Sequence, residues 1–336
     1  MTRQLVPLSL MRGGTSRGVA FRIENVPAEG VERDAFALRV FSGVDGLGGG
    51  TATTNKIVLV GTANDPTGDL EYIVGNVTAA GDAVDWSGTC GNMTAAVVPF
   101  ALAEGLITPV GNTVILQNLA TGGFVEVHTT KGTEVDPAEA EFELWMRYPS
   151  PGGSMLGSIF PTNAPYDRYD VEGHTIDGSL VDITHPYLLL RYQDVVAGPA
   201  CPSTEELRII EHIRGTVAHR LRLAESPAEA SQKSPAAPRV VLIKDRTADS
   251  VEITAISMGQ TIASVPVTAA FAVAGALRLG GTVLGDDSDS GEWDVLRVRG
   301  ASSTIEVGVE QDTEGKISAV SVKGTARTLL RGTAAI

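Results

Sequence analysis

Cys90, one of two cysteines in the chain, stands where small polar residues give way to a long apolar stretch. The segment SGTCGN (87–92) consists of residues typical of turns and helix N-caps, and the apolar run begins at Met93. This pattern predicts a thiol at a helix entrance, where unpaired N–H groups and the helix dipole favour negative charge. Thiols in such positions ionise readily, which suits an acid/base or nucleophilic group. The alternative is that Cys90 packs as a small hydrophobe, as many free cysteines do.

Two glycine-rich loops precede the cysteine and supply hydrogen-bond donors. The loop MRGGTSRG (11–18) combines two arginines with three glycines and two hydroxyl residues, and the loop DGLGGGTATTNK (45–56) ends in Lys56. In the first loop, glycines let backbone N–H groups converge on an anion, and arginine suits bidentate carboxylate binding. The alternatives are a solvated hairpin turn and a surface lysine. The second loop does not match a phosphate-binding motif, because neither Gly-Lys-Ser/Thr nor a third glycine follows at the required spacing. The candidate binding residues are Arg12, Gly14, Thr15, Ser16, Arg17, Thr53 and Thr54.

Composition restricts the class of partner. The chain has 26 Lys and Arg against 40 Asp and Glu, a net charge of −14, which argues against nucleic acid and anionic membranes as general partners. Its cysteines have neither zinc nor disulfide spacing, its N-terminal apolar run is short for a signal peptide, and no run reaches the length of a membrane span. We therefore expect a cytoplasmic protein, with a homodimer as an allowed assembly. The acidic composition does not exclude a small anionic substrate, because a site can be locally basic.

The elements that must position these residues are mostly strands separated by glycine-containing turns. Two segments, 91–104 and 267–279, are apolar on nearly every face and predict helices inside a core. Each carries Thr-Ala-Ala near its start, follows a strand that ends in glycine, and precedes further strands, so the order favours a duplicated unit over a chance likeness of alanine-rich helices. We expect domains 1–182 and 183–336, with the last residues packing back on the first domain.

One further helix and one loop are expected in the second half. The segment TEELRIIEHIRGTVAHRLRLA (204–224) is amphipathic at helical spacing and predicts a surface helix. The following segment, 225–238, is rich in Ala, Ser and Pro and predicts an exposed loop.

Four motifs together resemble the PrpF family, which includes 2-methylaconitate cis–trans isomerase, 4-oxalomesaconate tautomerase and 3-methylitaconate isomerase. The motifs are, in chain order, MRGGTSRGV, DGLGGGTATTNKIVLV, SGTCGNMTAAVVPFA and GTARTLLRG, and SIFPTN and SLVDITHP extend the resemblance over nearly the whole chain. The resemblance implies an α+β, diaminopimelate-epimerase-like fold, in which two similar domains each wrap a curved, mostly antiparallel sheet around a central helix.

The resemblance also implies a reaction, a proton shift in a small unsaturated di- or tricarboxylate without cofactor or metal. The family's acid/base residues match Lys56 and Cys90, and which of them is acid and which is base stays open. The chemistry suits both types, because amine and thiol exchange protons near neutral pH when their surroundings favour it. A developing enolate needs preorganised donors. The further binding residues expected are Asp85, Ser87, Gly91 and Asn92 beside the cysteine, and Met258 and Gly259 in the second domain.

The chain departs from the family pattern at three positions. The family loop usually has lysine where Arg17 stands, a family asparagine corresponds to His185, and the pattern Met-Gly-x-x-His would place histidine at Ile262. The missing histidine supports a second hypothesis, a carboxylate-binding protein without catalysis. A third, an epimerase or racemase with two opposed thiols, is disfavoured because the second helix entrance, 257–268, has no cysteine.

Overall fold

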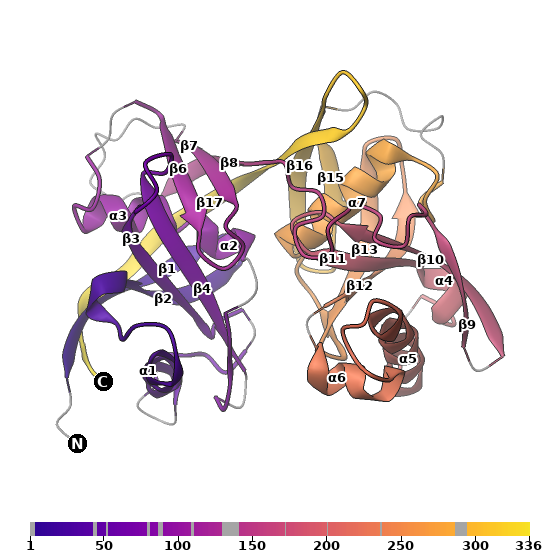
Figure 1. Ribbon diagram of the computed structural model, residues 1–336, viewed down its shortest axis with the longest axis horizontal. Helices are drawn as coiled ribbons and strands as arrows, with labels where there is room; N and C mark the ends of the chain where they lie inside the picture. Colours follow the sequence, from indigo (N-terminus) through magenta and orange to yellow (C-terminus); the bar gives the residue numbers. More distant parts are fainter. Residues whose placement is uncertain are drawn as a thin grey trace. The chain divides into compact units, whose positions relative to one another are not determined.

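The computed structural model describes residues 4–42, 46–51, 53–78, 81–86, 90–108, 111–129, 141–171, 173–199, 201–235, 237–285 and 294–336. The chain forms two compact units: unit 1 is Met1–Pro149 with Lys323–Ile336, and unit 2 is Ser150–Val322 (Figure 1). The boundary expected between 182 and 183 falls inside unit 2, within a hairpin in which Asp182 pairs with Pro186. The last residues belong to unit 1, because the long strand β17 (Ile317–Ala335) begins in unit 2 and ends against β1.

Unit 1 places its central helical segment within a sheet of alternating direction. Its elements are β1 (Leu5–Gly13), β2 (Ser16–Arg22), η1 (Ile23–Asn25), α1 (Val31–Phe41), β3 (Lys56–Thr62), β4 (Leu70–Val77), β5 (Val84–Asp85), α2 (Gly91–Thr94), α3 (Val97–Ala103), β6 (Thr113–Asn118), β7 (Phe124–Thr129) and β8 (Phe142–Pro149).

Unit 2 repeats that plan. Its elements are β9 (Asp167–Val171), β10 (His174–Asp182), β11 (Pro186–Arg191), α4 (Tyr192–Val195), α5 (Thr204–Arg220), η2 (Pro227–Glu229), α6 (Ala230–Lys233), β12 (Arg239–Arg246), β13 (Ser250–Ser257), β14 (Gln260–Ile262), α7 (Val267–Leu279), β15 (Leu296–Arg299), β16 (Thr304–Gln311) and the start of β17.

Strand pairing confirms the expected duplication. In unit 1, β1 pairs antiparallel with β2, β2 parallel with β3, β3 antiparallel with β4, and β4 parallel with β6. In unit 2, β10, β11, β12, β13 and β15 repeat this series of directions in the same order. In both units the central helix is inserted between the fourth and fifth strands of the series, so one supersecondary plan occurs twice.

The two central helices differ in continuity. The helix predicted over 267–279 is α7 over those residues, and it is buried from Val267 to Leu277 among the strands of unit 2 (Figure 1). The helix predicted over 91–104 is divided into α2 and α3. Pro99 explains the break, because it cannot donate to the carbonyl of Ala95. The turn tightens there, and Ala96 N donates to Met93 O at 3.0 Å.

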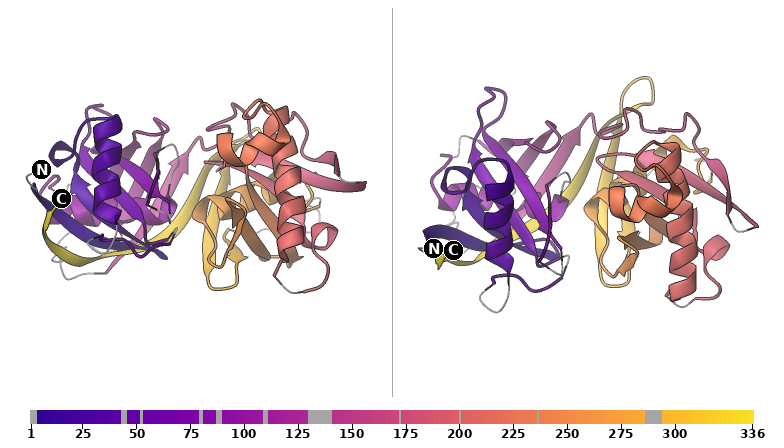
Figure 2. Two further views of the ribbon diagram at one scale, coloured as in Figure 1. Left: turned by 90° about the horizontal axis from the view of Figure 1, so that it is seen from below. Right: turned by 60° about the horizontal axis from the view of Figure 1, so that its bottom comes forward.

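A further helix covers the outer face of each sheet (Figure 2). Phe36 and Val40 of α1 pack in one buried cluster with Ile57 of β3. In unit 2, Ile213 of α5 packs with Leu190 of β11. The surface helix predicted over 204–224 is thus α5, over Thr204–Arg220, with a capping box at its start.

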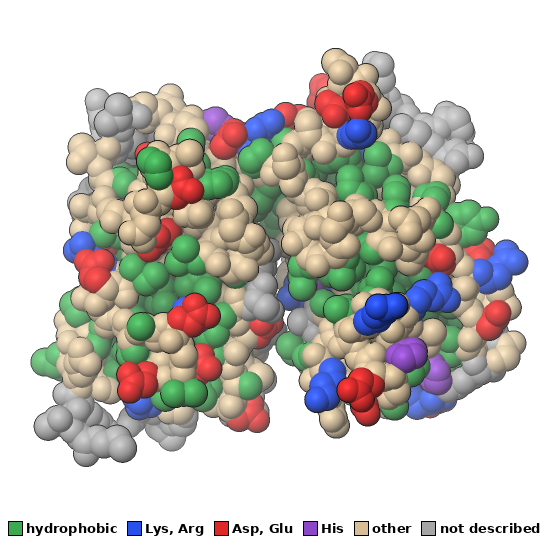
Figure 3. Space-filling view, viewed as in Figure 1, with side chains coloured by type: hydrophobic (Ala, Val, Ile, Leu, Met, Phe, Trp, Pro, Cys, Tyr) green, Lys and Arg blue, Asp and Glu red, His purple; other side chains and the backbone are tan. Residues whose placement is uncertain are grey.

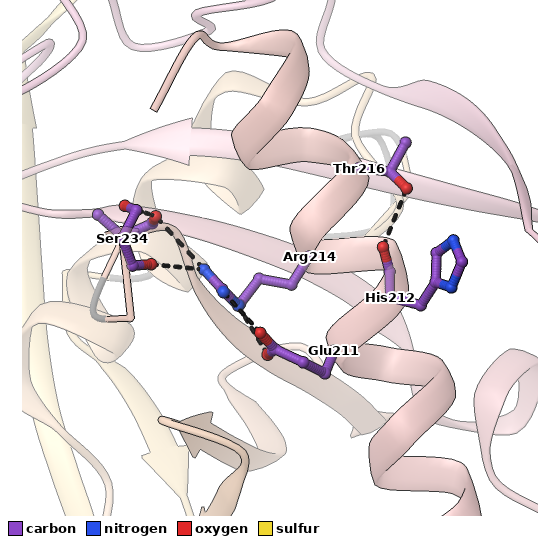
Figure 4. Close-up of polar contacts among 6 residues, drawn as sticks. Glu211, His212, Arg214, Thr216 and Ser234 are labelled. Carbon is purple, nitrogen blue, oxygen red and sulfur yellow. Dashed lines mark hydrogen bonds and ion pairs between the residues drawn. The ribbon is translucent and has the colours of Figure 1, made fainter. Parts of the chain in front are cut away.

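The loop predicted over 225–238 is wrong, because this segment contains η2 and α6, which pack on α5. The predicted exposure holds for about half of the segment, including residues 231–233. Arg214 of α5 is 3% exposed and holds the segment in place. It donates to the carbonyl oxygen of Ser234 at 2.8 Å, and Glu211 pairs with its guanidinium at 2.6 Å (Figure 4). Ala230 and Ala237 are buried in this segment, whereas Ala228 and Ser231 are exposed.

The face of the molecule drawn in Figure 3 carries charges of both signs. On the face drawn in Figure 3, acidic and basic side chains are interspersed among apolar and neutral ones. None of the helices in the described part of the chain is both long and apolar enough to cross a membrane.

Candidate functional site

Lys56 begins β3 on the face of the sheet that holds the central helical segment. Successive side chains of a strand point to opposite faces, and Ile57 packs toward α1 on the outside. Lys56 lies opposite Asn76 of β4, and its Nζ donates to Asn76 Oδ1 at 2.6 Å. Tyr72 lies on the same face of β4 and contacts α2 through its hydroxyl. Alternation therefore turns the lysine amine inward, where it is 8% exposed.

Asp85 extends this row to a third strand. It is paired opposite Asn76 in β5. The next residue, Trp86, points outward, because its Nε1 donates to Asp34 of α1 at 2.7 Å. By alternation Asp85 shares the inner face with Lys56 and Asn76, so three neighbouring strands each contribute a polar side chain at the same level.

Cys90 is the N-cap residue of α2, as the sequence predicts. Its backbone is extended, and its carbonyl oxygen accepts two hydrogen bonds from Thr94, one from the backbone N at 2.9 Å and one from Oγ1 at 3.1 Å. The residue is half-buried, so it lies at the edge of the core rather than inside it. This exposure does not favour the alternative in which the thiol only packs.

Close backbone approach brings the 11–18 loop, α2 and Lys56 together. A Cβ at Gly18 would lie 2.8 Å from Lys56 O and 2.9 Å from Met93 Cε. Gly14 adopts a φ of +50°, which residues with a side chain rarely adopt. Asn92 links α2 to the 11–18 loop, because its Nδ2 donates to Thr15 Oγ1 at 3.0 Å. The loop, the helix start and the lysine are therefore neighbours within unit 1.

The second loop is organised by Asn55, a residue that the sequence analysis missed. Its Oδ1 accepts hydrogen bonds from the backbone N of Gly49 at 3.1 Å and of Gly50 at 2.9 Å, and its Nδ2 donates to Thr78 O. These two glycine N–H groups therefore bind Asn55 and are not free to cradle an anion. The loop instead supplies hydroxyl groups, including Thr54 Oγ1.

The two arginines of the first loop have different surroundings. Arg12 pairs with Glu141 and donates to Gly14 O and Thr325 Oγ1, so its guanidinium supports the loop. The Nε of Arg17 is buried without a hydrogen-bond partner, and no acid pairs with this arginine among the described residues. Arg17 therefore carries the positive charge of this loop that is available to an anion.

Arg17 also lies against the second loop. Its backbone N donates to Thr53 O at 2.8 Å. A Cβ at Gly49 would lie 2.9 Å from Arg17 Nη2 and 2.5 Å from Thr54 Oγ1. The absence of a side chain at Gly49 thus gives the guanidinium and the threonine hydroxyl room beside the loop.

The remaining predicted residues are less informative. Gly91 is the buried first residue of α2, and Ser87 lies outside the described residues. Met258 and Gly259 both have positive φ and form the exposed turn between β13 and β14 in unit 2. Their role in binding stays a prediction. Ile262 follows in β14, half-buried opposite Ala255.

Two buried tyrosines near Cys90 were also missed. Burial raises the pKa of Tyr72 to about 12, although its hydrogen bonds with Thr94 and Asn118 partly oppose this shift. Burial likewise raises the pKa of Tyr148 well above its usual value. Both phenols therefore stay protonated at neutral pH. Asn76 was missed as well. The sequence signal for a buried polar group is a polar residue at an inward position of an apolar strand, as Asn76 is in LEYIVGNV.

Within the described ranges, no three His, Cys, Asp or Glu side chains lie close enough together to bind a metal ion.

Comparison with known proteins agrees with this architecture. The family model "PrpF protein" matches residues 3–336. The 3-methylitaconate isomerase of Eubacterium barkeri is 28% identical over 97% of this chain and 96% of its own length. The 4-oxalomesaconate tautomerase of Pseudomonas putida is 28% identical over 100% of this chain and 97% of its own length. The relatives are thus isomerases and a tautomerase, the class expected from the sequence.

Solved structures show the same fold. The crystal structure of methylitaconate-delta-isomerase superposes with a TM-score of 0.78 at 24% identity, covering 99% of this chain and 96% of that one. A hydroxyproline epimerase from Agrobacterium vitis gives a TM-score of 0.61 at 15% identity, covering 100% and 94%. The expected epimerase-like fold with two similar units is confirmed, and the chain belongs to the PrpF family.

Proposed function

We propose that this PrpF family member is a cofactor-independent isomerase that moves a proton and a double bond in a small unsaturated di- or tricarboxylate. The relatives suggest a substrate of the methylaconitate, methylitaconate or oxalomesaconate type. Lys56 and Cys90 are the two acid/base residues. The two reduced cysteines are consistent with a cytoplasmic enzyme.

The reaction needs one group that removes a proton and one that returns a proton. One of the pair takes a proton from the carbon next to a carboxylate or carbonyl group, and the electron pair of that C–H bond moves into the allylic system as an enolate. The other group protonates the far carbon, and the double bond shifts. Positioned general acids and bases of this kind accelerate reactions by about 10²–10⁴-fold.

The anionic parts of the substrate need fixed positive charge and donors. Arg17 suits a carboxylate because its guanidinium can donate two parallel hydrogen bonds. The hydroxyl groups of Thr15 and Ser16 lie near Asn92 at the start of α2, where the developing enolate would be stabilised by fixed donors. Arg12 is left out of the binding set because Glu141 already holds it.

The surroundings of the Lys56 amine carry the proposal. The amine is buried, and its hydrogen-bond partner is the neutral amide of Asn76. Among the described residues no carboxylate forms an ion pair with it. A lysine that only contributed to stability at this depth would be expected to pair with an acid. This amine instead keeps donor positions for an anionic ligand beside the helix that carries Cys90.

The test is deuterium exchange into a panel of substrates. The purified protein is incubated in deuterated water with 2-methylaconitate, 3-methylitaconate, 4-oxalomesaconate and aconitate, and both deuterium uptake and isomer formation are followed by NMR. We expect turnover of at least one compound and a loss of about a hundredfold or more in Cys90→Ser and in Lys56→Ala. The two losses should not add in the double variant, because both groups serve one proton shift.

Cys201→Ser is the matched control, since the second cysteine is exposed in unit 2 and should not affect the rate. Undiminished exchange in Cys90→Ser would make the cysteine a packing residue. If a panel compound binds in calorimetry but takes up no deuterium, the result would support a carboxylate-binding protein without catalysis instead.

A further inference from the structure

A buried chain of hydrogen bonds ends on the carbonyl oxygen of Cys90. Tyr72, Thr94 and Asn118 form it, and none of them is more than 2% exposed. They come from three elements of unit 1, because Tyr72 lies on β4, Thr94 ends α2 and Asn118 ends β6. The oxygen atoms of Tyr72 and Thr94 are 3.1 Å apart, and Asn118 Nδ2 is 3.3 Å from the Tyr72 hydroxyl.

The direction of each hydrogen bond in this chain can be worked out. Thr94 Oγ1 donates its single proton to the carbonyl oxygen of Cys90, so it must accept from Tyr72. The Tyr72 oxygen in turn accepts from Asn118. The amide of Asn118 is oriented for this, because its Oδ1 accepts from Ala120 N at 2.9 Å. Every donor therefore points toward Cys90.

We infer that Tyr72, Thr94 and Asn118 are positioning residues for the Cys90 thiol. The inference rests on the proposed role of Cys90. Bonds aligned in one direction polarise one another, and their positive ends face the helix start that bears the thiol. The network thus fixes the backbone of Cys90 through its carbonyl oxygen, and with it the position of the thiol at the start of α2.

The ionisation of Tyr72 supports this arrangement. Burial is the main cause of the raised pKa of Tyr72, and the nearby Cys90 adds a smaller rise. The phenol therefore stays protonated at neutral pH and can donate its hydrogen bond to Thr94. Because the Tyr72 hydroxyl keeps its proton near neutral pH, the hydrogen bonds of the network keep one direction and one geometry.

Unit 2 contains a matched pair without a cysteine. Tyr187 and Thr268 bring their hydroxyl groups within 2.8 Å at the start of α7, and both residues are buried. The residue before α7 is Pro266, which carries no ionisable side chain. Removing the Tyr187 hydroxyl should therefore disturb the fold about as much as removing that of Tyr72, without affecting the Cys90 thiol.

The test measures Cys90 alkylation by iodoacetamide at pH 7.5 in a Cys201→Ser background, where Cys90 is the remaining thiol. We expect Tyr72→Phe and Thr94→Val to slow alkylation about threefold or more, the effect of losing one net hydrogen bond. Thr94→Ser, which keeps the hydroxyl, should restore the rate, and Tyr187→Phe should leave it unchanged. With a panel compound that turns over, Tyr72→Phe should lower kcat about tenfold and change KM less than twofold.

Each result decides the inference. An unchanged alkylation rate in folded Tyr72→Phe overturns it, and so does an equal slowing in Tyr187→Phe, which would reveal only general loosening. If Thr94→Val does not fold, Tyr72→Phe decides alone, because it removes a single oxygen atom. Alkylation needs no substrate, so a protein without isomerase activity would refute the proposed function and still report on the network.

Discussion

Gly18→Ala tests whether the position of Lys56 depends on close backbone packing. The added Cβ would lie 2.8 Å from Lys56 O and 3.2 Å from Lys56 Cβ, whereas real Cβ contacts essentially never fall under 3.0 Å. Met93 Cε, at 2.9 Å, can swing aside, but the Lys56 carbonyl belongs to the paired strand β3 and cannot. Relief therefore requires a shift of about half an ångström between β2 and β3, and overpacking of this kind costs about 1–3 kcal/mol.

Such a shift moves the Lys56 amine away from its partner on β4. A displacement of about 1 Å in a catalytic group can cost about a hundredfold in rate, so we expect about a tenfold loss in kcat and a lower melting temperature. Gly332→Ala is the matched control, because that glycine pairs with Leu8 on the other edge of β1 and its nearest atom is 3.7 Å away. If Gly18→Ala keeps the wild-type kcat and melting temperature, β2 and β3 can accommodate the added Cβ without moving Lys56, and the prediction is refuted.

Three further predictions concern the acid Asp182, the loop organiser Asn55 and the two loop arginines. Burial is the largest influence on Asp182 and raises its pKa above the ordinary 3.8, so folding favours the protonated acid, and its contribution to stability is lost as pH rises through the native pKa. Asp182→Asn should remove this part of the pH dependence in urea unfolding measured from pH 3 to 7, and an unchanged profile would contradict it. Asn55→Ala removes three hydrogen bonds and should lower the free energy of unfolding by about 2–3 kcal/mol in urea titrations, while raising KM. Arg17→Ala should raise KM about tenfold or more with an unchanged melting temperature, whereas Arg12→Ala should mainly lower the melting temperature; the reverse pattern in steady-state kinetics and thermal melts would exchange their roles.

Local patterns predicted the parts of the fold that depend on neighbours in sequence. The apolar run that forms α7 ends at Gly280, whose φ of +69° is one that residues with a side chain rarely adopt. Cys90 was placed at a helix start by the turn residues around it, and the structure agrees. The break in the first central helix was also readable, since Pro99 lies inside the predicted segment.

Contacts between distant residues decided what the sequence analysis missed. Arg12 and Arg17 look equivalent in the loop, and only Glu141, 129 residues away, separates a supporting arginine from an available one. The domain boundary was misplaced because the apolar run after Asp182 looks like the first strand of a domain. This run forms β11, and its hairpin partner β10 precedes it in the chain. Such pairings depend on three-dimensional neighbours that no local pattern specifies.

The duplication also bears on the proposed roles of Lys56 and Cys90. Lys56 begins β3 beside Gly18, and Arg239 begins β12 beside Tyr187, so the two cations occupy corresponding register positions. Arginine does not give up its proton near neutral pH, and the residue before α7 is a proline. The second unit thus keeps the scaffold and a positive charge but offers neither an exchangeable amine nor a thiol at the corresponding positions. Epimerisation by opposed thiols needs one at each helix start, whereas an allylic proton shift can use the amine and the thiol of unit 1 together.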